Sequence, residues 1–497
     1  MLMDVSEALS SEFRQALADA LPDVSQSYSD DEDYGEKRAA WNILTQYRPA
    51  GVVQPRSTRD VSTILKIASE YGVEQVSMRS GGHSFEGLSL GGEGGASLVI
   101  DMIEMNNITC DSEQHVLHAE GGALLGDVYM QAWEHGQQMI PMGSCVTVGL
   151  GGQVQAGGYG HYSRTFGILS DRVIEFELVT ADGEVRTVNE NVHADLFYAL
   201  RGSGTGSFGV ITKVSLRTND SPTAVGNFMV RWALKEFDIP DLLKRIQRKC
   251  LDAPLSFNPM VMMWLGVLEV SGTILTDDPV ERDKVWVDFL EDLPQPTATD
   301  FRAQTFIESV RDLGLSQTSA PWYHDLTTVS REGREHLRYM KIKAGFLPAE
   351  MPDSFLDDLG ALAVTQPDCG VRVQILAMDP DRTPDPDTTS IKVRNFPWLM
   401  GMSVWLEASE YDGEEGATAA GVARRPWLTE AYELFYPLCD GGYIGDDDIE
   451  EAGNGRDALE SYFGNHLPRL QEIKAKYDPR NIFHHPLSIP LPAQTAK

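Results

Sequence analysis

The chain has 497 residues, which exceeds the size of a single ordinary hydrophobic core, so two domains are the default expectation. Apolar residues make up 42% of the sequence, as in folded globular proteins, and the formal net charge is -33 at pH 7. So acidic a balance excludes nucleic acids and anionic membranes as natural partners, because both need basic protein surface.

Two further features predict a cytoplasmic protein. The first residues lack the basic and apolar segments of a signal peptide, and no apolar run is long enough to span a bilayer. The five cysteines are few, widely spaced and odd in number, which fits a reducing compartment better than a disulfide framework.

The first 220 residues predict short strands alternating with helices. Ser57 and Asp60 form a capping-box pattern that opens an amphipathic helix reaching about residue 71. Two strand-like runs, 173–180 and 184–188, flank an Ala-Asp-Gly turn and indicate a hairpin. Further strands are expected at 74–78, 97–101, 115–120 and 210–216, and helices at 124–135 and 195–201.

Beyond a polar boundary at 218–222, the pattern changes to longer strands. Strands are expected at 226–234, 260–275, 339–346, 371–378 and 400–408, and helices at 235–251, 279–293, 353–362 and 416–438. Strands of about ten residues with helices between them indicate one broad antiparallel sheet covered by helices on one face. Residues 379–389 are expected to form a loop, and a helix is expected from 452 to about 477.

Residues 143–160 form a glycine-rich stretch with Cys145 as its reactive side chain. Glycine allows positive φ angles and close approach of a ligand to the main chain. Buried-type residues such as Val148 and Tyr159 alternate with the glycines, which argues against a flexible linker. We therefore expect a loop shaped around a flat or phosphorylated cofactor.

Two other glycine motifs carry chemistry. Residues 79–84 (Arg-Ser-Gly-Gly-His-Ser) follow a strand, so their N–H groups suit an anion nest in which His83 contacts a cofactor. Residues 204–209 match G-x-G-x-x-G, but a helix precedes this motif and a strand follows it. Because the nucleotide fingerprint needs the opposite order, a Rossmann site is rejected.

Other site types find little support. The sequence has no P-loop, no H-E-x-x-H and no G-x-S-x-G motif. His484 and His485 lack the ligand spacing of a metal site, so no metal is predicted.

Five motifs in order resemble a known family. The chain is similar to the berberine-bridge-enzyme-like FAD-linked oxidases of the vanillyl-alcohol-oxidase / p-cresol-methylhydroxylase superfamily. The resemblance covers roughly residues 40–220 and 440–490, and its motifs lie at 79–84, 143–149, 195–202, 208–212 and 477–483.

This resemblance implies an α+β fold with two domains. Residues 1–220 would form the N-terminal part of a p-cresol-methylhydroxylase-type FAD-binding domain, which residues 441–497 would complete. Residues 221–440 would form a substrate-binding domain with the large antiparallel sheet backed by helices.

The resemblance also implies a bicovalent FAD, bonded at its 8α-methyl group to His83 and at C6 to Cys145. A cysteine beside glycine N–H dipoles ionises more readily, which suits this chemistry. Val148 matches the position that controls oxygen access, and valine there resembles oxidases. The other expected cofactor contacts are Arg79, Ser80, Gly81, Gly82, Ser84, Gly149, Gly152, Gln153, Gly157, Gly158, Gly160, Gly209, Val210, Ile211, Tyr477 and Asn481.

The catalytic positions depart from the family pattern. Gln153 stands where many relatives have histidine, and Asp446 stands where the second tyrosine of the Tyr-x-Asn-Tyr pattern is often the base. Trp405 lies near the family's Glu or Gln position, and Glu407 shares its strand face. Tyr443, Asp446 and Glu407 are therefore competing candidates for the base.

The implied reaction is hydride transfer from a small alcohol, amine or phenolic secondary metabolite to flavin, with dioxygen reduced to hydrogen peroxide. The aromatic side chains at 228, 264 and 405 and Met262 would suit an aromatic ligand. Alternatives are a carbohydrate (oligosaccharide) oxidase, a dehydrogenase or oxidative cyclase, and a scaffold whose redox role is vestigial. The expected partners are this substrate and dioxygen, in a monomer or homodimer.

Overall fold

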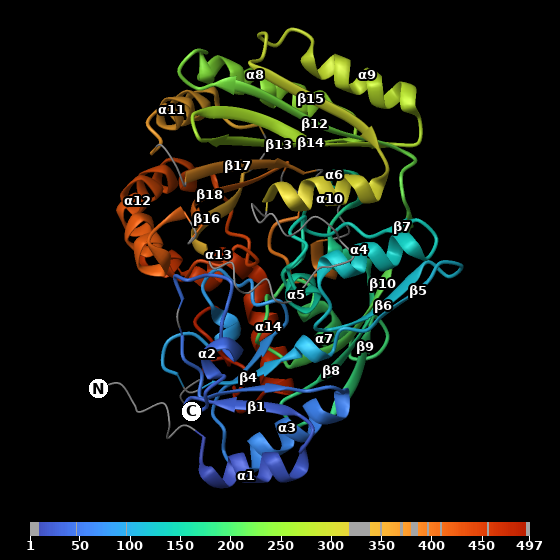
Figure 1. Ribbon diagram of the computed structural model, residues 1–497, viewed down its shortest axis with the longest axis vertical. Coiled ribbons are helices and arrows are strands. Elements are labelled where there is room, and N and C mark those ends of the chain that lie inside the picture. The colour runs from blue at the N-terminus through green and yellow to red at the C-terminus, as the bar shows by residue number, and fades with distance from the viewer. Residues whose placement is uncertain are drawn as a thin grey trace.

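The computed structural model describes residues 9–45, 47–95, 97–317, 338–347, 350–367, 371–378, 386–394, 397–407, 410–454 and 457–493. This part of the chain forms two halves stacked along the long axis of the molecule (Figure 1). One half contains α1 (Ser11–Ala20) near the start of the chain and α14 (Leu467–Tyr477) near its end. The other half is built around a single seven-stranded sheet.

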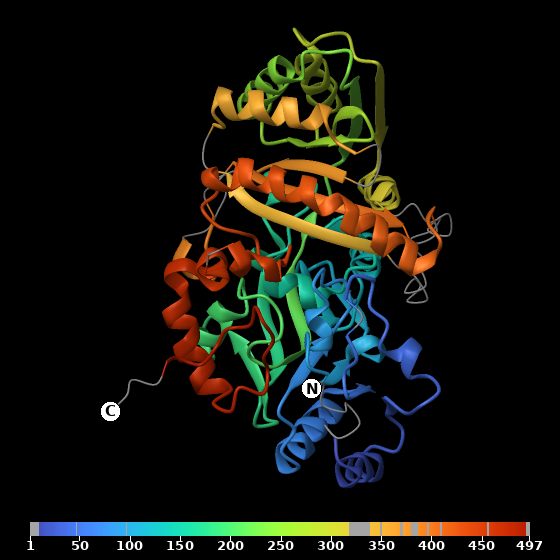
Figure 2. The same ribbon diagram turned by 90° about the vertical axis from the view of Figure 1, so that its left-hand side faces the viewer.

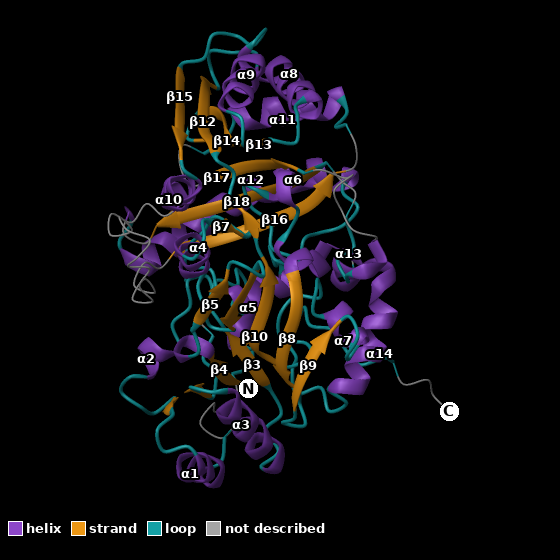
Figure 3. Cartoon of the chain, turned by 90° about the vertical axis from the view of Figure 1, so that its right-hand side faces the viewer, coloured by secondary structure: helices purple, strands orange, loops and turns teal. Residues whose placement is uncertain are grey.

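Among the described residues, the first half has two larger sheets, both visible in Figure 3, and a two-stranded sheet of β7 (Gln138–Met139) and β11 (Asn219–Asp220). The four-stranded sheet has the order β1 (Ser25–Tyr28), β2 (Gly51–Gln54), β4 (Leu98–Asp101), β3 (Val76–Arg79). The five-stranded sheet has the order β5 (Ile108–Asp111), β6 (Val116–Glu120), β10 (Val210–Arg217), β8 (Val173–Val179), β9 (Val185–Asn189). The expected β8–β9 hairpin is confirmed, and its turn contains Gly183 at φ 75°.

Helices of the first half begin and end near their predicted positions. In α3 (Thr58–Glu70) the Ser57 side chain accepts a hydrogen bond from the N–H of Asp60, as the capping pattern predicted. The helices α4 (Leu125–Glu134) and α7 (Ala194–Ala199) are also present. The glycine-rich stretch is not a loop throughout, because α5 (Leu150–Ala156) forms within it.

The predicted broad sheet is confirmed, and all its strand pairs are antiparallel. Helices cover one of its faces (Figures 1 and 2), and residues of α8 (Ile239–Asp252), α9 (Pro279–Leu290), α11 (Asp353–Val364) and α12 (Gly413–Phe435) pack in the core between these helices and the sheet. The strand order is β15 (Ala298–Gln304), β12 (Ala224–Ala233), β14 (Val267–Thr276), β13 (Phe257–Trp264), β17 (Val371–Ala377), β18 (Trp398–Glu407), β16 (Arg338–Leu347).

Two predicted elements differ from the structure. The single strand expected at 260–275 is two strands, because Leu265 (φ 48°) and Gly266 (φ 76°) form a tight turn between β13 and β14. The helix expected from 452 is divided into shorter helices, including α13 (Ala458–Phe463) and α14. The sequence reading missed β15 and the following α10 (Phe306–Gln317). Of the loop expected at 379–389, residues 379–385 lie outside the described residues.

Alternation along the sheet strands decides which side chains face the first half. On β12, Val230 and Trp232 are buried in the core beneath the helices. Met229 and Arg231 point to the opposite face, where they line a cavity. The uncovered face of the sheet therefore forms one wall of the space between the two halves.

The last helices return to the first half of the molecule (Figures 2 and 3). Buried Lys474 of α14 donates to Asp478 and to the carbonyl oxygens of Ser207 and Phe483, and so fixes this return. Within the described residues, no helix is long and apolar enough to cross a membrane. The boundaries at 220/221 and 440/441 stay predictions.

Candidate active site

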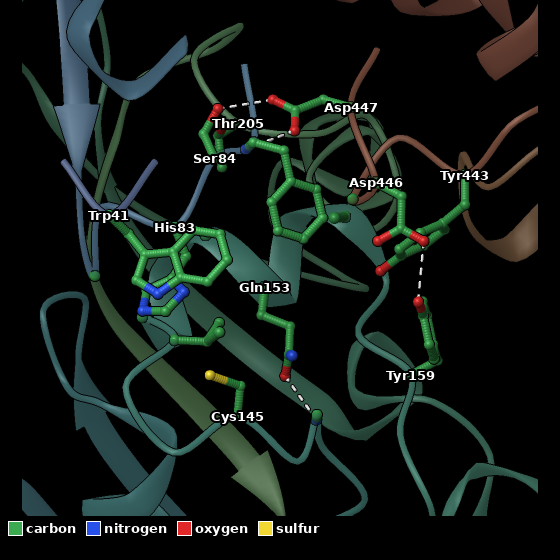
Figure 4. Close-up of a pocket in the computed structure, with 18 of the residues that line it drawn as sticks. Trp41, His83, Ser84, Cys145, Gln153, Tyr159, Thr205, Tyr443, Asp446 and Asp447 are labelled. Atoms are coloured by element: carbon green, nitrogen blue, oxygen red, sulfur yellow. Dashed lines mark hydrogen bonds between the residues drawn. The ribbon is translucent and has the colours of Figure 1, made fainter. Parts of the chain in front are cut away.

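A large cavity lies where the two halves meet, and it collects side chains from distant parts of the chain (Figure 4). It encloses about 1470 Å³ of space between atoms, counting its open mouth. His83, Cys145, Trp405, Tyr443 and Asp446 all line it.

His83 lies in the loop that follows β3. Gly82 turns this loop with a φ angle of 74°, a conformation that favours glycine. The His83 imidazole stacks on the indole of Trp41, with ring centroids 5.1 Å apart and planes 26° apart. The backbone N–H of Trp41 donates to the carbonyl oxygen of Gly82 over 3.1 Å. The turn and the stack together present His83 to the cavity.

Cys145 reaches the same cavity from the glycine-rich stretch. Its Sγ atom lies 3.7 Å from the hydroxyl oxygen of Thr147. The Gln153 side chain on α5 accepts a hydrogen bond from the N–H of Gly143, which holds the loop just before Cys145 (Figure 4). Gln153 thus both lines the cavity and holds the loop that carries Cys145.

The glycines of these loops fit a cavity shaped for a flat ligand. A Cβ atom on Gly152 would meet no protein atom closer than 3.8 Å, so it would fill cavity space. A Cβ atom on Gly149 would lie 2.1 Å from the backbone nitrogen of Gly81. Close packing of the two loops therefore requires glycine at 149, whereas a side chain at 152 would take up space inside the cavity. His83 and Cys145 are nucleophilic groups suited to bonding an electron-poor ring, so the residues present fit a flavin.

The comparisons with known proteins agree with this geometry. Residues 49–189 match the family described as FAD binding domain, and residues 443–490 match that described as berberine and berberine like. The chain is 25% identical to a glucooligosaccharide oxidase from Sarocladium strictum, covering 95% of this chain and 93% of that protein. It is 26% identical to a tetrahydroberberine oxidase from Berberis wilsoniae, covering 90% of this chain and 86% of that one. The solved structure of wild-type BBE-like 1 from Physcomitrella patens superposes with a TM-score of 0.85 at 26% identity, covering 97% of this chain and all of that one.

The chain belongs to the berberine-bridge-enzyme-like FAD-linked oxidases. Its fold, its FAD cofactor and its oxidoreductase class follow from this membership, as the resemblance predicted. The relatives include oxidases of carbohydrates and of an alkaloid, so membership leaves the substrate class open.

The berberine-like segment at the end of the chain brings Asp446 to the cavity. The Tyr159 hydroxyl donates to the Asp446 carboxylate over 2.9 Å (Figure 4). Burial raises the pKa of Asp446 to about 7, although the Tyr159 hydrogen bond lowers it and neighbouring Asp447 raises it further. In Figure 4 Asp446 lies on the opposite side of the cavity from His83. A carboxylate with such a pKa is suited to accept a proton near neutral pH.

Tyr443 is also buried against this cavity but is less suited to act as a base. Its hydroxyl oxygen accepts a hydrogen bond from the N–H of Gly158. Burial raises its pKa well above the usual value for tyrosine, and negative Asp446 raises it further. Its ring packs edge-on against Tyr159, with centroids 5.0 Å apart. Tyr443 therefore supports Tyr159 and the glycine-rich stretch.

The structure places Trp405 at the cavity but does not bring Glu407 there. The Glu407 carboxylate accepts hydrogen bonds from the guanidinium of Arg338 at 2.7 Å and from the indole N–H of Trp405 at 3.2 Å. Glu407 does share a strand face with Trp405, but its ion pair turns its carboxylate toward Arg338. This geometry offers no support for Glu407 as the base.

Several predicted cofactor contacts also lie away from this cavity. Arg79 is fully buried and pairs with Asp101 at 2.8 Å, so its guanidinium shapes the loop without facing the cavity. Gly209 directly precedes β10, and Val210 and Ile211 are the first two residues of that strand and are fully buried. Ser80, Gly81, Ser84, Val148 and Gly160 line the cavity, whereas Gly157, Gly158, Tyr477 and Asn481 do not.

The sequence reading missed Tyr159, Trp41 and Asp447 as site residues. Asp447 accepts hydrogen bonds from the Ser84 hydroxyl (2.7 Å) and from the N–H of Phe85 (2.9 Å), and so clamps the loop that carries His83. Burial raises the pKa of Asp447 to about 7. Tyr159 could have been found from its place among glycines, but only the fold shows that it meets Asp446. Trp41 lies in an irregular segment that gives no sequence signal.

A second cavity continues from the first across the uncovered face of the seven-stranded sheet. Tyr159, His161, Trp405 and Asp446 line both cavities. The middle of the second cavity is apolar, and its far end is charged. The apolar side chains are Met229, Met260, Met262 and Trp264, and the charged ones are Arg231, Glu269, Asp300, Arg302 and Asp312.

Proposed function

We propose that this protein is an oxidase with bicovalently bound FAD that takes hydride from a small organic substrate. The observation that carries the proposal is the composition of one cavity. His83 and Cys145 lie on one side of it, and buried Asp446 with its Tyr159 hydrogen bond lies on the other. A flavin held by the first pair would leave the substrate between its ring and the carboxylate.

In this proposal, Asp446 removes a proton from the hydroxyl or amine group of the substrate. Tyr159 holds the carboxylate in place and stabilises its charged form. The bound flavin supplies a hydride acceptor that dioxygen reoxidises, yielding hydrogen peroxide. The apolar floor made by Met260, Met262 and Trp264 supports an alcohol, amine or phenolic substrate with an aromatic body.

His83 and Cys145 would each form one bond to the flavin. Each bond replaces one hydrogen on the flavin and the N–H or S–H hydrogen of the side chain. The two protons and two electrons released per bond pass to dioxygen, which becomes hydrogen peroxide. Val148 lines the cavity. A valine at this position is typical of the oxidases that the chain resembles, which supports dioxygen as the electron acceptor.

Two measurements test the proposal. Acid-precipitated protein should keep its yellow colour in the pellet, and digestion should give flavin-bearing peptides that contain His83 and Cys145. A screen of alcohols, amines, phenols and sugars for peroxide release should identify the substrate. Complete loss of colour to the supernatant would refute the covalent links, and slow reoxidation of reduced protein by air in stopped flow would favour the dehydrogenase alternative. Bleaching by a substrate without oxygen excludes a vestigial flavin.

A carbohydrate oxidase is the second candidate, favoured by the charged end of the second cavity. Glu269, Asp300 and Asp312 offer acceptors for sugar hydroxyls, and Trp264 offers a flat apolar face. The similar proteins named glucooligosaccharide oxidase and xylooligosaccharide oxidase also support it. Peroxide release with oligosaccharides but not with phenols would decide for this candidate.

A further inference from the structure

The aromatic stack beside His83 is part of a larger buried arrangement. The indole of Trp41 covers one face of the His83 imidazole. The indole of Trp405 meets Trp41 edge-on, with centroids 5.3 Å apart. The Arg338 guanidinium lies 5.7 Å from the ring of Trp41 and 5.1 Å from that of Trp405, within reach of cation–π attraction to both.

Hydrogen bonds fix Trp41 from both halves of the molecule. Its N–H donates to the carbonyl of Gly82 in the His83 loop, and its carbonyl accepts from the N–H of Arg338 on β16. The neighbouring Asn42 side chain donates to the carbonyl oxygens of both Phe85 and Met340. Trp41 is itself buried. These bonds hold the backbone of Trp41 to both the loop and the sheet, and the burial of its indole against Phe85 and Trp405 restricts rotation of the ring away from His83.

Glu407 completes this arrangement. It pairs with Arg338, whose side chain is only 3% exposed, and it accepts the indole N–H of Trp405. A buried guanidinium needs such a partner, because an unpaired buried charge is strongly unfavourable. The carboxylate thus holds Arg338 and Trp405 where they brace Trp41.

We propose that Trp41 is a positioning residue that holds the His83 imidazole in the orientation from which it bonds to flavin. The inference rests on the proposed covalent link at His83. Forming that link replaces one C–H and one N–H bond by a C–N bond, and dioxygen takes up the two protons and two electrons. In this step the imidazole nitrogen must point at one carbon atom of the flavin. Stacking on Trp41 restricts the rotation of the ring and so keeps it in the orientation that reacts. Glu407, Arg338 and Trp405 act through Trp41.

The test compares linkage at His83 with linkage at Cys145 in the same molecules. Trp41→Leu removes the aromatic face, and Trp41→Phe keeps a smaller one. Each purified protein is incubated with added FAD in air, digested at intervals, and the flavin-bearing fraction of both peptides is measured by mass. We expect Trp41→Leu to slow linkage at His83 by roughly two- to tenfold, as the size of aromatic pair energies implies, while linkage at Cys145 is unchanged. Trp41→Phe should lie between Trp41→Leu and the wild type.

Trp286 provides a matched control, because it stacks on Phe301 in the other half of the molecule with centroids 5.2 Å apart and planes 11° apart. In Trp286→Leu, flavin should become linked to both peptides at the wild-type rate.

An unchanged rate of linkage at His83 in Trp41→Leu would overturn the proposal, as would equal slowing at both peptides. If Trp41→Leu does not fold, Glu407→Gln tests the stack from its far side: slowing at His83 alone supports the proposal, and an unchanged rate overturns it. Wild-type protein without flavin on either peptide would instead refute the proposed function.

Discussion

In the proposed mechanism, Asp446 and Tyr159 set the pH at which substrate can reduce the flavin. With the pKa of Asp446 near 7, the ionised base becomes scarce below neutral pH, so the rate should fall as pH drops. The Tyr159 hydrogen bond lowers this pKa, so Tyr159→Phe should move the acid limb to higher pH. The rate of anaerobic flavin reduction, measured by stopped flow across pH in the wild type and in Tyr159→Phe, checks both the fall in acid and its shift. An acid limb that stays in place in Tyr159→Phe would contradict the assignment.

Asp446→Asn should lose activity but gain stability. Loss of a general base lowers the rate by about 10²–10⁴-fold. The pKa of Asp446 is raised in the folded state from 3.8, so its contribution to stability is full below about pH 4 and is lost as pH rises through about 7. The variant, which has no charge to bury, should therefore melt higher than wild type at pH 8 and equally at pH 4. Melting curves at the two pH values check this, and a lower melting temperature at pH 8 would contradict it.

At the scale of elements, β16 has one face at the cavity and the other on a buried ion cluster. Met340 and Ile342 line the cavity. Lys341 pairs with Glu86 of the loop that follows His83 and with Asp448 of the C-terminal segment. Burial alone would raise the pKa of Asp448, but Lys341 and Lys343 together lower it below its usual value, so the pairing is lost in acid as pH falls through that lowered pKa.

Lys341→Met should destabilise the protein, because it leaves the Glu86 and Asp448 carboxylates buried without this partner. Breaking a buried ion pair on one side costs about 3–5 kcal/mol. Denaturant unfolding at neutral pH measures the change. Lys244→Met is the control. Its ion-pair partner Asp357 is about half exposed to solvent, so loss of this pair should lower the free energy of unfolding far less. Equal effects of the two substitutions would contradict the importance of the cluster.

At the scale of the whole molecule, the net charge of -33 should make stability depend on salt. Like charges repel one another in the compact state, and salt screens them over about 10 Å at 0.1 M. The melting temperature should therefore rise with sodium chloride concentration above 0.1 M or so, in calorimetry at fixed pH. Sucrose at matched osmolality serves as the uncharged comparison. A melting temperature that falls as salt is added would contradict this expectation.

Elements with local causes could be predicted from the amino-acid sequence. The Ser57 cap, the turn at Gly183 and the alternation in the long strands all depend on residues close in the chain. The ordered motifs around His83 and Cys145 likewise indicated the family and its cofactor. The break at Leu265–Gly266 was missed because apolar strands on both sides gave one continuous pattern.

Which carboxylate reaches the cavity could not be predicted from the sequence, because it depends on contacts between distant segments. Asp446 and Glu407 were equal candidates in the sequence, but one meets Tyr159, 287 positions away, and the other is held by Arg338, 69 positions away. The pairing of Trp41 with His83 and Arg338 likewise joins three separate segments. The physical reason is that side-chain contacts and burial depend on how distant segments pack, and these set the pKa values and orientations on which the chemistry depends.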